Sequence, residues 1–170
     1  TGVAAIRRDE DGVTVKTEAG DEERFDEVVI AAHSDQALRM LVDADETERS
    51  VLGAMPYQDN DVILHEDPAV MPRRRKTWAA WNYFVPEAPE RSASVTDDMN
   101  IRQGQDSARD FLVSLNRRDD IDPEMIHAEM TYEHPLFDAA SVAAKTRFAE
   151  ISGRRRTHFC GAYWGHGFHE

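Results

Sequence analysis

A run of five apolar residues, Val28-Val29-Ile30-Ala31-Ala32, is the feature that most constrains the fold of this chain. Polar segments bound the run on both sides, and Ser34 or Asp35 can cap a helix that follows over 36–41. A short continuous apolar run of this kind is typical of a strand that is buried on both faces. The run therefore predicts that a parallel sheet, covered by helices, forms part of the fold.

The residues before and after this run add a hairpin and a second helix. Segments 3–6 and 13–17 alternate apolar and polar residues, and the turn residue Gly12 lies between them, which predicts two antiparallel strands. Asp45 is followed by Glu48 three positions later, the spacing of a capping box that opens a helix.

The middle of the chain has a different pattern. Short apolar segments separated by polar loops predict mostly antiparallel strands over 61–66, 76–85, 94–101, 111–116 and 125–133. A helix over 139–150 and a last strand over 154–160 follow. The prediction is an α+β fold, with α/β elements at both ends and a mostly antiparallel sheet between them. Because the two ends share one pattern, we expect 1–41 and 154–170 to form one domain and 42–153 to form another.

Composition excludes several classes of protein. The 20 Lys and Arg against 33 Asp and Glu give a net charge of -13, which argues against a nucleic-acid partner. No apolar run approaches the length of a membrane span. The single cysteine, Cys160, excludes an intrachain disulfide and a multi-thiolate zinc site, and a reducing cytoplasm is the default location. His166 and His169 lack the companions of a metal site, so no metal is expected.

Several segments together resemble the flavin-containing amine oxidase-like superfamily, and within it the group described as predicted NAD/FAD-binding oxidoreductases. The segments that carry the resemblance are Val3–Ile6, Asp11–Val15, Phe25–Ala32, Pro72–Arg75, Trp78–Tyr83, Tyr132–Pro135 and Cys160–Glu170. Members of this superfamily bind FAD through an N-terminal G-x-G-x-x-G turn, and this chain lacks that spacing. The resemblance therefore implies that the chain is a C-terminal fragment of a longer protein, inactive by itself.

The resemblance also implies which residues contact FAD. Val3 matches the position whose backbone meets the adenine edge, and Ala31, Ala32 and His33 follow the strand that runs up to the cofactor. The closing motif, where the backbone approaches the isoalloxazine ring and ribityl chain, is matched by Gly161, Tyr163, Trp164, Gly165, Gly167, Phe168 and Glu170. Tyr163 or Trp164 is also a candidate wall of the substrate cavity.

The function implied is that of an FAD-dependent oxidoreductase, of desaturase or amine oxidase type, acting on a hydrophobic small molecule by hydride transfer to flavin. Amine oxidases of this fold carry a lysine near the flavin, on the strand that corresponds to 61–66. That segment has no lysine here, and its nearest ionisable side chain is His65, so a desaturase-type reaction is preferred. No catalytic residue is identified. The alternatives are a non-catalytic binding module that keeps a flavoprotein fold, and a cofactor-free enzyme, for which no distinctive carboxylate pair is found.

Some residues have plainer interpretations. Trp78, Trp81 and Tyr83 alternate as core residues of a strand do, although one face of that strand can still border an apolar cavity. The basic run 73–76 indicates a solvated face, with contact to an acidic substrate or lipid headgroup as the alternative, and the same holds for 154–156. His33 is either a proton carrier or a strand-end cap, and Cys160 is expected to be buried and inert.

Overall fold

The computed structural model describes residues 1–86 and 94–167, which fold into two compact units. The first unit comprises 1–58 and 135–170, and the second unit comprises 59–134. Helices and mostly antiparallel strands give an α+β fold, as predicted. The assignment of 1–41 with 154–170 to a cofactor domain and of 42–153 to a substrate domain concerns function, and it stays a prediction.

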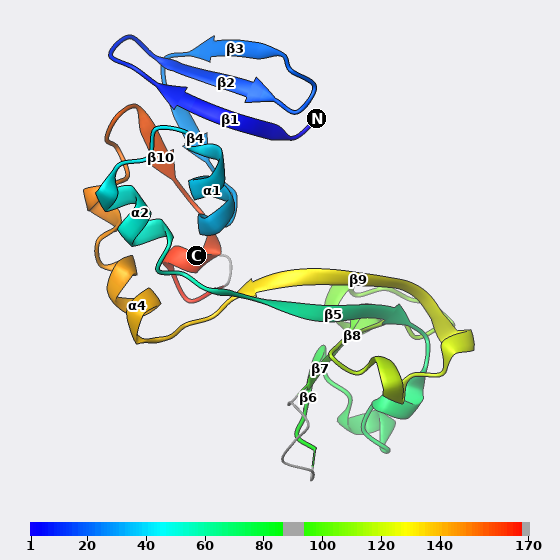
Figure 1. The fold of residues 1–170 in the computed structure, drawn as a ribbon. Helices are drawn as coiled ribbons and strands as arrows, with labels where there is room; N and C mark the ends of the chain where they lie inside the picture. Colours follow the sequence, from blue (N-terminus) through cyan, green and yellow to red (C-terminus); the bar gives the residue numbers. More distant parts are fainter. Residues whose placement is uncertain (87–93, 168–170) are drawn as a thin grey trace. The chain divides into compact units, whose positions relative to one another are not determined.

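The first unit holds two small sheets (Figure 1). Its elements are β1 (Val3–Arg8), β2 (Val13–Thr17), β3 (Glu22–Phe25), β4 (Val28–Ile30), α1 (Ser34–Met40), α2 (Glu46–Leu52), α4 (Ala139–Lys145) and β10 (Thr157–Phe159). Strands β1, β2 and β3 form an antiparallel sheet, which confirms the predicted hairpin. The hairpin turns where the Asp9 carboxylate accepts hydrogen bonds from the Asp11 and Gly12 N–H groups.

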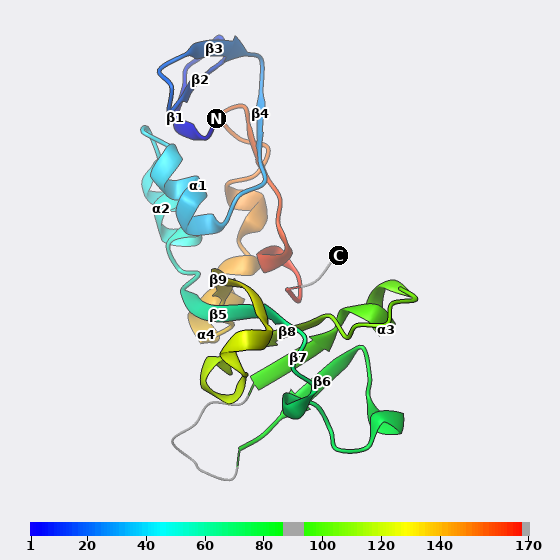
Figure 2. The same ribbon diagram turned by 90° about the vertical axis from the view of Figure 1, so that its right-hand side faces the viewer.

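Strands β4 and β10 are the parallel pair of this unit, and they lie side by side in Figures 1 and 2. Val28 pairs with Thr157 and Ile30 pairs with Phe159, so both strands run in the same direction. Ile30 is 3% exposed, but Val29 is 65% exposed. The prediction of a parallel strand is therefore confirmed, whereas burial on both of its faces is wrong for the described residues.

The helices of the first unit pack around an apolar core. The capping box at the start of α2 is confirmed, because the Asp45 carboxylate accepts from the Glu48 N–H at 2.8 Å and the Glu48 carboxylate accepts from the Asp45 N–H at 2.9 Å. Helix α1 begins at Ser34 with His33 at the N-cap position, so the prediction that Ser34 or Asp35 caps this helix is wrong, because both residues lie inside its first turn. The largest fully buried apolar side chains of this core are Val13, Val51, Leu52 and Ile151.

The second unit is built on a sheet in the order β6-β7-β8-β5-β9. Its elements are β6 (Trp81–Phe84), β7 (Ser94–Asp98), α3 (Met99–Gln103), β8 (Leu112–Leu115) and most of β5 (Tyr57–His65) and β9 (Ile126–Pro135), whose outer ends belong to the first unit. The strand predicted over 94–101 is too long, because the Asp98 carboxylate accepts from the Ile101 N–H and begins α3. The strand predicted over 76–85 is shorter, because 75–77 form a 3-10 turn.

The interior of the second unit is polar as well as apolar. Ile63, Val70 and Ile121 form an apolar cluster. Buried polar residues of the central strands are His65, Ser94, Thr96, Asp98 and Ser114. Trp81 and Tyr83 lie on the edge strand β6 and are 58% and 59% exposed, so the interpretation of these two rings as core residues is wrong.

Candidate functional site

The carboxyl ends of β4 and β10 meet at one edge of their sheet, because the two strands are parallel. The Cys160 N–H donates to the Ile30 carbonyl at 3.1 Å, one residue beyond the strand ladder. Ala31, Cys160 and Gly161 are exposed there, and we call this region the carboxyl edge. Ligands of open α/β sheets bind outside the carboxyl ends of the strands. The structure thus brings the predicted residues Ala31 and Gly161 to such an edge, whereas the prediction of a buried Cys160 is wrong.

Gly161 allows the chain to turn sharply after β10. Its φ is +153°, and a Cβ at this position would lie 2.5 Å from Cε1 of Tyr163. The Gly161 carbonyl accepts from the Trp164 N–H at 3.1 Å and closes a 3-10 turn over 162–164. The glycine is therefore required so that the Tyr163 ring can fold back against the backbone.

Two polar atoms of this turn are buried without a hydrogen bond of standard geometry in the described part of the chain. They are the Tyr163 hydroxyl and the Trp164 indole nitrogen, whose rings lie 5.0 Å apart. Burial, followed by the neighbouring Tyr57, raises the pKa of the Tyr163 hydroxyl above its usual range, and the Trp164 N–H opposes this shift. Tyr163 is therefore a neutral hydrogen-bonding group, and buried groups of this kind normally have a partner.

His33 lies at the start of α1 and packs against an aromatic ring. Its imidazole stacks on Tyr57 with ring centroids 4.6 Å apart, and its side chain forms no cap of the helix. The Ser34 N–H donates to the Tyr57 hydroxyl at 2.8 Å, a contact between residues 23 positions apart. The sequence offers no local signal for Tyr57, because this contact depends on the tertiary fold. Ala32 is half-buried beside His33.

The remaining predicted residues of the closing motif follow Trp164. Gly167 has a φ of +88°, and a Cβ there would lie 3.1 Å from Cε2 of Phe137. The Lys145 ammonium group donates to the Gly165 carbonyl, so α4 supports this segment. Phe168 and Glu170 lie outside the described residues, and their predicted roles stay predictions.

Val3 belongs to the same compact unit but to a different sheet. It begins β1 and is 39% exposed. Figures 1 and 2 show the start of β1 separated from the end of β10. The predicted contacts, the adenine edge at Val3 and the isoalloxazine ring and ribityl chain at Gly161, are untested and stay predictions.

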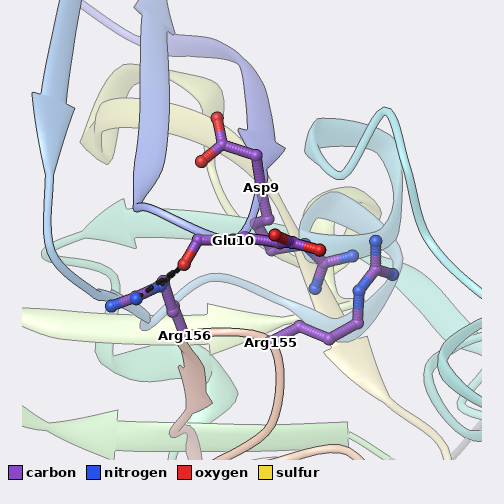
Figure 3. Close-up of a pocket in the computed structure, with 5 residues that line it drawn as sticks. Asp9, Glu10, Arg155 and Arg156 are labelled. Atoms are coloured by element: carbon purple, nitrogen blue, oxygen red, sulfur yellow. Dashed lines mark hydrogen bonds between the residues drawn. The ribbon is translucent and has the colours of Figure 1, made fainter.

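The amino ends of β4 and β10 border a different cavity, of about 520 Å³, and we call this region the amino edge (Figure 3). Its lining residues are Arg8, Asp9, Glu10, Arg155 and Arg156. Arg8 has a side chain only 1% exposed and forms ion pairs with Asp43 and Glu48. Burial acts to lower the pKa of Arg8, but hydrogen bonds and charges from Glu48 and Asp43 outweigh it and raise the pKa. The sequence predicts Glu48 as a cap and gives no sign of this second role.

Arg155 and Arg156 form the turn before β10 with φ values of 48° and 60°. This left-handed conformation is unfavourable for residues other than glycine. Hydrogen bonds compensate for it: Arg155 donates to the Asp43 carboxylate at 2.9 Å. Arg156 donates to the Glu10 carbonyl at 2.7 Å, as Figure 3 shows. Arg154 and Arg155 are exposed, as a solvated face predicts, and Arg155 also pairs with the Asp43 carboxylate.

In the second unit, β5 is the strand on which the resemblance placed a lysine. His65 ends this strand and is fully buried. Its Nδ1 accepts from the Asp67 N–H at 3.1 Å, so its proton lies on Nε2, 2.9 Å from the Ser114 hydroxyl oxygen. The Ser114 hydroxyl in turn lies 2.7 Å from that of Thr96. Burial lowers the pKa of His65 to about 4, which keeps the imidazole neutral at pH 7.

Two further classes of site are not found in the part of the chain that the structure describes. No helix in residues 1–86 or 94–167 has the length and apolar character needed to cross a bilayer. Over the same residues, no three His, Cys, Asp or Glu side chains are grouped in a way that would hold a metal ion.

Comparison with known proteins identifies relatives of the fold. The family model described as "Flavin containing amine oxidoreductase" matches residues 1–111. No curated protein matches the chain. Three similar solved structures are a CLA-producing fatty acid isomerase from P. acnes (18% identity, TM-score 0.59), a reduced UDP-galactopyranose mutase (15%, 0.61) and the cyclohexylamine oxidase from Brevibacterium oxydans IH-35A (13%, 0.58).

These structures cover 94%, 95% and 96% of this chain, which in turn covers 42%, 41% and 42% of theirs. The chain therefore spans about two fifths of the length of the structures it matches. At such low identity, the likeness establishes the fold alone.

Proposed function

Because the chain belongs to the flavin-containing amine oxidoreductase family, we propose that the whole protein is an FAD-dependent oxidoreductase and that this chain supplies part of its cofactor site. In this proposal, 1–41 and 154–170 contribute to FAD binding and 42–153 contribute to substrate binding. A cytoplasmic location is part of the same proposal.

The observation that carries the proposal is the carboxyl edge of β4 and β10. Ala31, Cys160 and Gly161 are exposed there, and Gly161 packs against Tyr163, whose hydroxyl is buried. A flat, polar ring system fits these features, because Gly161 has no side chain to prevent close approach, and a ligand that reaches the Tyr163 hydroxyl would supply a hydrogen-bond partner. The edge therefore fits the flavin end of FAD.

When bound, the flavin supplies the capacity to accept a hydride from substrate, chemistry that side chains lack. The chain contributes binding and orientation. The backbone of Ala31 and Gly161 would contact the cofactor, and the neutral Tyr163 hydroxyl would hold a hydrogen bond without adding charge. The stacked pair of His33 and Tyr57 keeps the start of α1 fixed beside this edge.

We propose a hydrophobic substrate and a desaturase-type oxidation rather than amine oxidation. Strand β5 contains no lysine, and its ionisable end residue His65 is buried and neutral at pH 7. The similar structures include a fatty acid isomerase and a cyclohexylamine oxidase, so proteins of this fold act on both kinds of substrate. The similarity to the fatty acid isomerase supports a hydrophobic substrate.

The test is the visible absorption spectrum of the full-length protein, purified with and without added FAD. The proposal expects a yellow protein with flavin bands. The Gly161→Ala variant should lose at least about tenfold in FAD affinity, because its Cβ would displace the Tyr163 ring. Gly20→Ala is the matched control, since Gly20 also has a positive φ but nothing lies within 4 Å of its added Cβ. A colourless protein that takes up no FAD would favour the non-catalytic binding module.

A further inference from the structure

The second unit contains a cavity of about 300 Å³ between the 3-10 turn Pro68–Val70, the segment after it, and β6. Its apolar walls include Val70 and Met71, which are buried, and the rings of Tyr83 and Phe84, which are partly exposed. The volume is at the lower limit of small-molecule sites, which run from about 300 to 1,000 Å³. We call it the arginine cavity, because both charged residues among its described lining are arginines, Arg73 and Arg117.

The described residues that line this cavity carry a charge opposite to that of the chain. The sequence has 33 Asp and Glu against 20 Lys and Arg, yet no carboxylate is among the described residues that line the cavity. A cavity that combines apolar walls with cations suits an amphipathic anion, and it disfavours a ligand that carries an ammonium group.

The two arginines differ in what they already bind. Arg117 is buried, donates to Asp120 and to the Val70 carbonyl, and lies 4.1 Å from the centroid of the Phe84 ring. It therefore fixes one wall of the cavity. The Arg73 guanidinium is exposed and makes no hydrogen bond or ion pair with any described residue. Arg73 is thus the group that remains available to pair with a ligand.

We propose that the arginine cavity binds the carboxylate of a fatty acid, with Arg73 pairing with the carboxylate and the first methylene groups lying against Met71, Tyr83 and Phe84. Arginine and a carboxylate form paired, charge-assisted hydrogen bonds. The role of this ligand as substrate rests on the proposed function, but its binding does not, because all the contacts come from the second unit.

The experiment titrates the purified full-length protein with dodecanoate, below the micelle concentration, by isothermal calorimetry. Wild type should bind dodecanoate, and Arg73→Ala should weaken binding about tenfold, with partial recovery in Arg73→Lys. Arg74→Ala is the matched control: Arg74 is the next residue, is also exposed, and does not line the cavity. Its affinity should stay within about twofold of wild type, and circular dichroism should show that all variants are folded.

Ligands of the same length separate charge from apolar contact. Dodecanol should bind at least about tenfold more weakly than dodecanoate, dodecyltrimethylammonium should bind more weakly still, and acetate should not bind measurably. The proposal is overturned if wild type does not bind dodecanoate, if Arg74→Ala loses as much affinity as Arg73→Ala, or if the ammonium ligand binds as well as the carboxylate. A flavin-free full-length protein with intact dodecanoate binding would defeat only the oxidoreductase proposal.

Discussion

At the amino edge of β4 and β10, the buried side chains of Arg8 and Glu48 pair with each other, whereas at the carboxyl edge of the same strands Tyr163 and Trp164 bury polar atoms without such partners among the described residues. Buried polar groups that are paired hold a fold together, and those left unpaired cost stability. A buried polar group without a partner is tolerated most readily where a bound ligand completes its hydrogen bonds. The difference supports the proposal that the carboxyl edge contacts a ligand, whereas the contacts at the amino edge hold the fold together.

The largest expected effect comes from breaking the pair at the amino edge. Glu48→Gln leaves the Arg8 guanidinium buried with only Asp43 as a charged partner, and should lower the free energy of unfolding of the first unit by about 3 kcal/mol. Hydrogen exchange of the β10 amides measures this. Glu46→Gln, an exposed change in the same helix turn, should stay within about 0.5 kcal/mol of wild type. Equal losses in both variants would contradict a structural amino edge.

His65 extends the comparison to a buried, hydrogen-bonded group of the second unit. Its folded pKa is about 4, below the usual 6.5, so the unfolded chain takes up the proton first as the pH falls. Stability contributed by neutral His65 is therefore lost from about pH 6.5 downward and levels off below about pH 4. Between pH 7 and pH 5 the loss should be about 2 kcal/mol.

The measurement is hydrogen exchange of the β8 amides at both pH values. A His65→Gln variant should lack this part of the pH dependence, because glutamine does not titrate. Identical pH slopes in the variant and wild type would show that the buried imidazole does not control the stability of the second unit.

At the carboxyl edge, removing a polar group should raise the free energy of unfolding instead of lowering it. Tyr163→Phe removes a buried hydroxyl that has no standard hydrogen bond in the described chain, and should stabilise the isolated chain by about 1–2 kcal/mol. Tyr57→Phe is the contrasting variant, because its hydroxyl bonds to the Ser34 N–H and its loss should destabilise. Hydrogen exchange of β10 compares the two. If both variants destabilise the first unit equally, the Tyr163 hydroxyl has a hydrogen-bond partner in the folded chain.

The sequence predicted the elements whose signals are local. The Asp45 capping box, the hairpin around Gly12 and a parallel strand within the apolar run 28–32 all depend on neighbouring residues, and all are confirmed, the strand over 28–30. The strand predicted over 94–101 ends at Asp98, because the Asp98 side chain caps helix α3. Apolar periodicity does not report such a cap.

The candidate site was predictable only in part. Resemblance pointed to Gly161, and its positive φ and contact with Tyr163 explain why glycine stands there. The partners that hold the two edges, Tyr57 with Ser34 and Arg8 with Glu48, are 23 and 40 positions apart. Contacts at such separations come from tertiary packing, so composition and periodicity carry no trace of them.

The smallest effect tests how the amino edge holds its left-handed turn. Arg156→Ala and Arg156→Gly both remove the hydrogen bonds to the Glu10 and Asp26 carbonyls, but only glycine relieves the backbone at a φ of 60°. The glycine variant should therefore be more stable than the alanine variant by about 1 kcal/mol. At Arg154, which is absent from the positive-φ residues of the described chain, glycine should be no better than alanine. If alanine equals glycine at 156, the turn relaxes once its arginine is lost, and the hydrogen bonds rather than the adjoining strands impose its conformation.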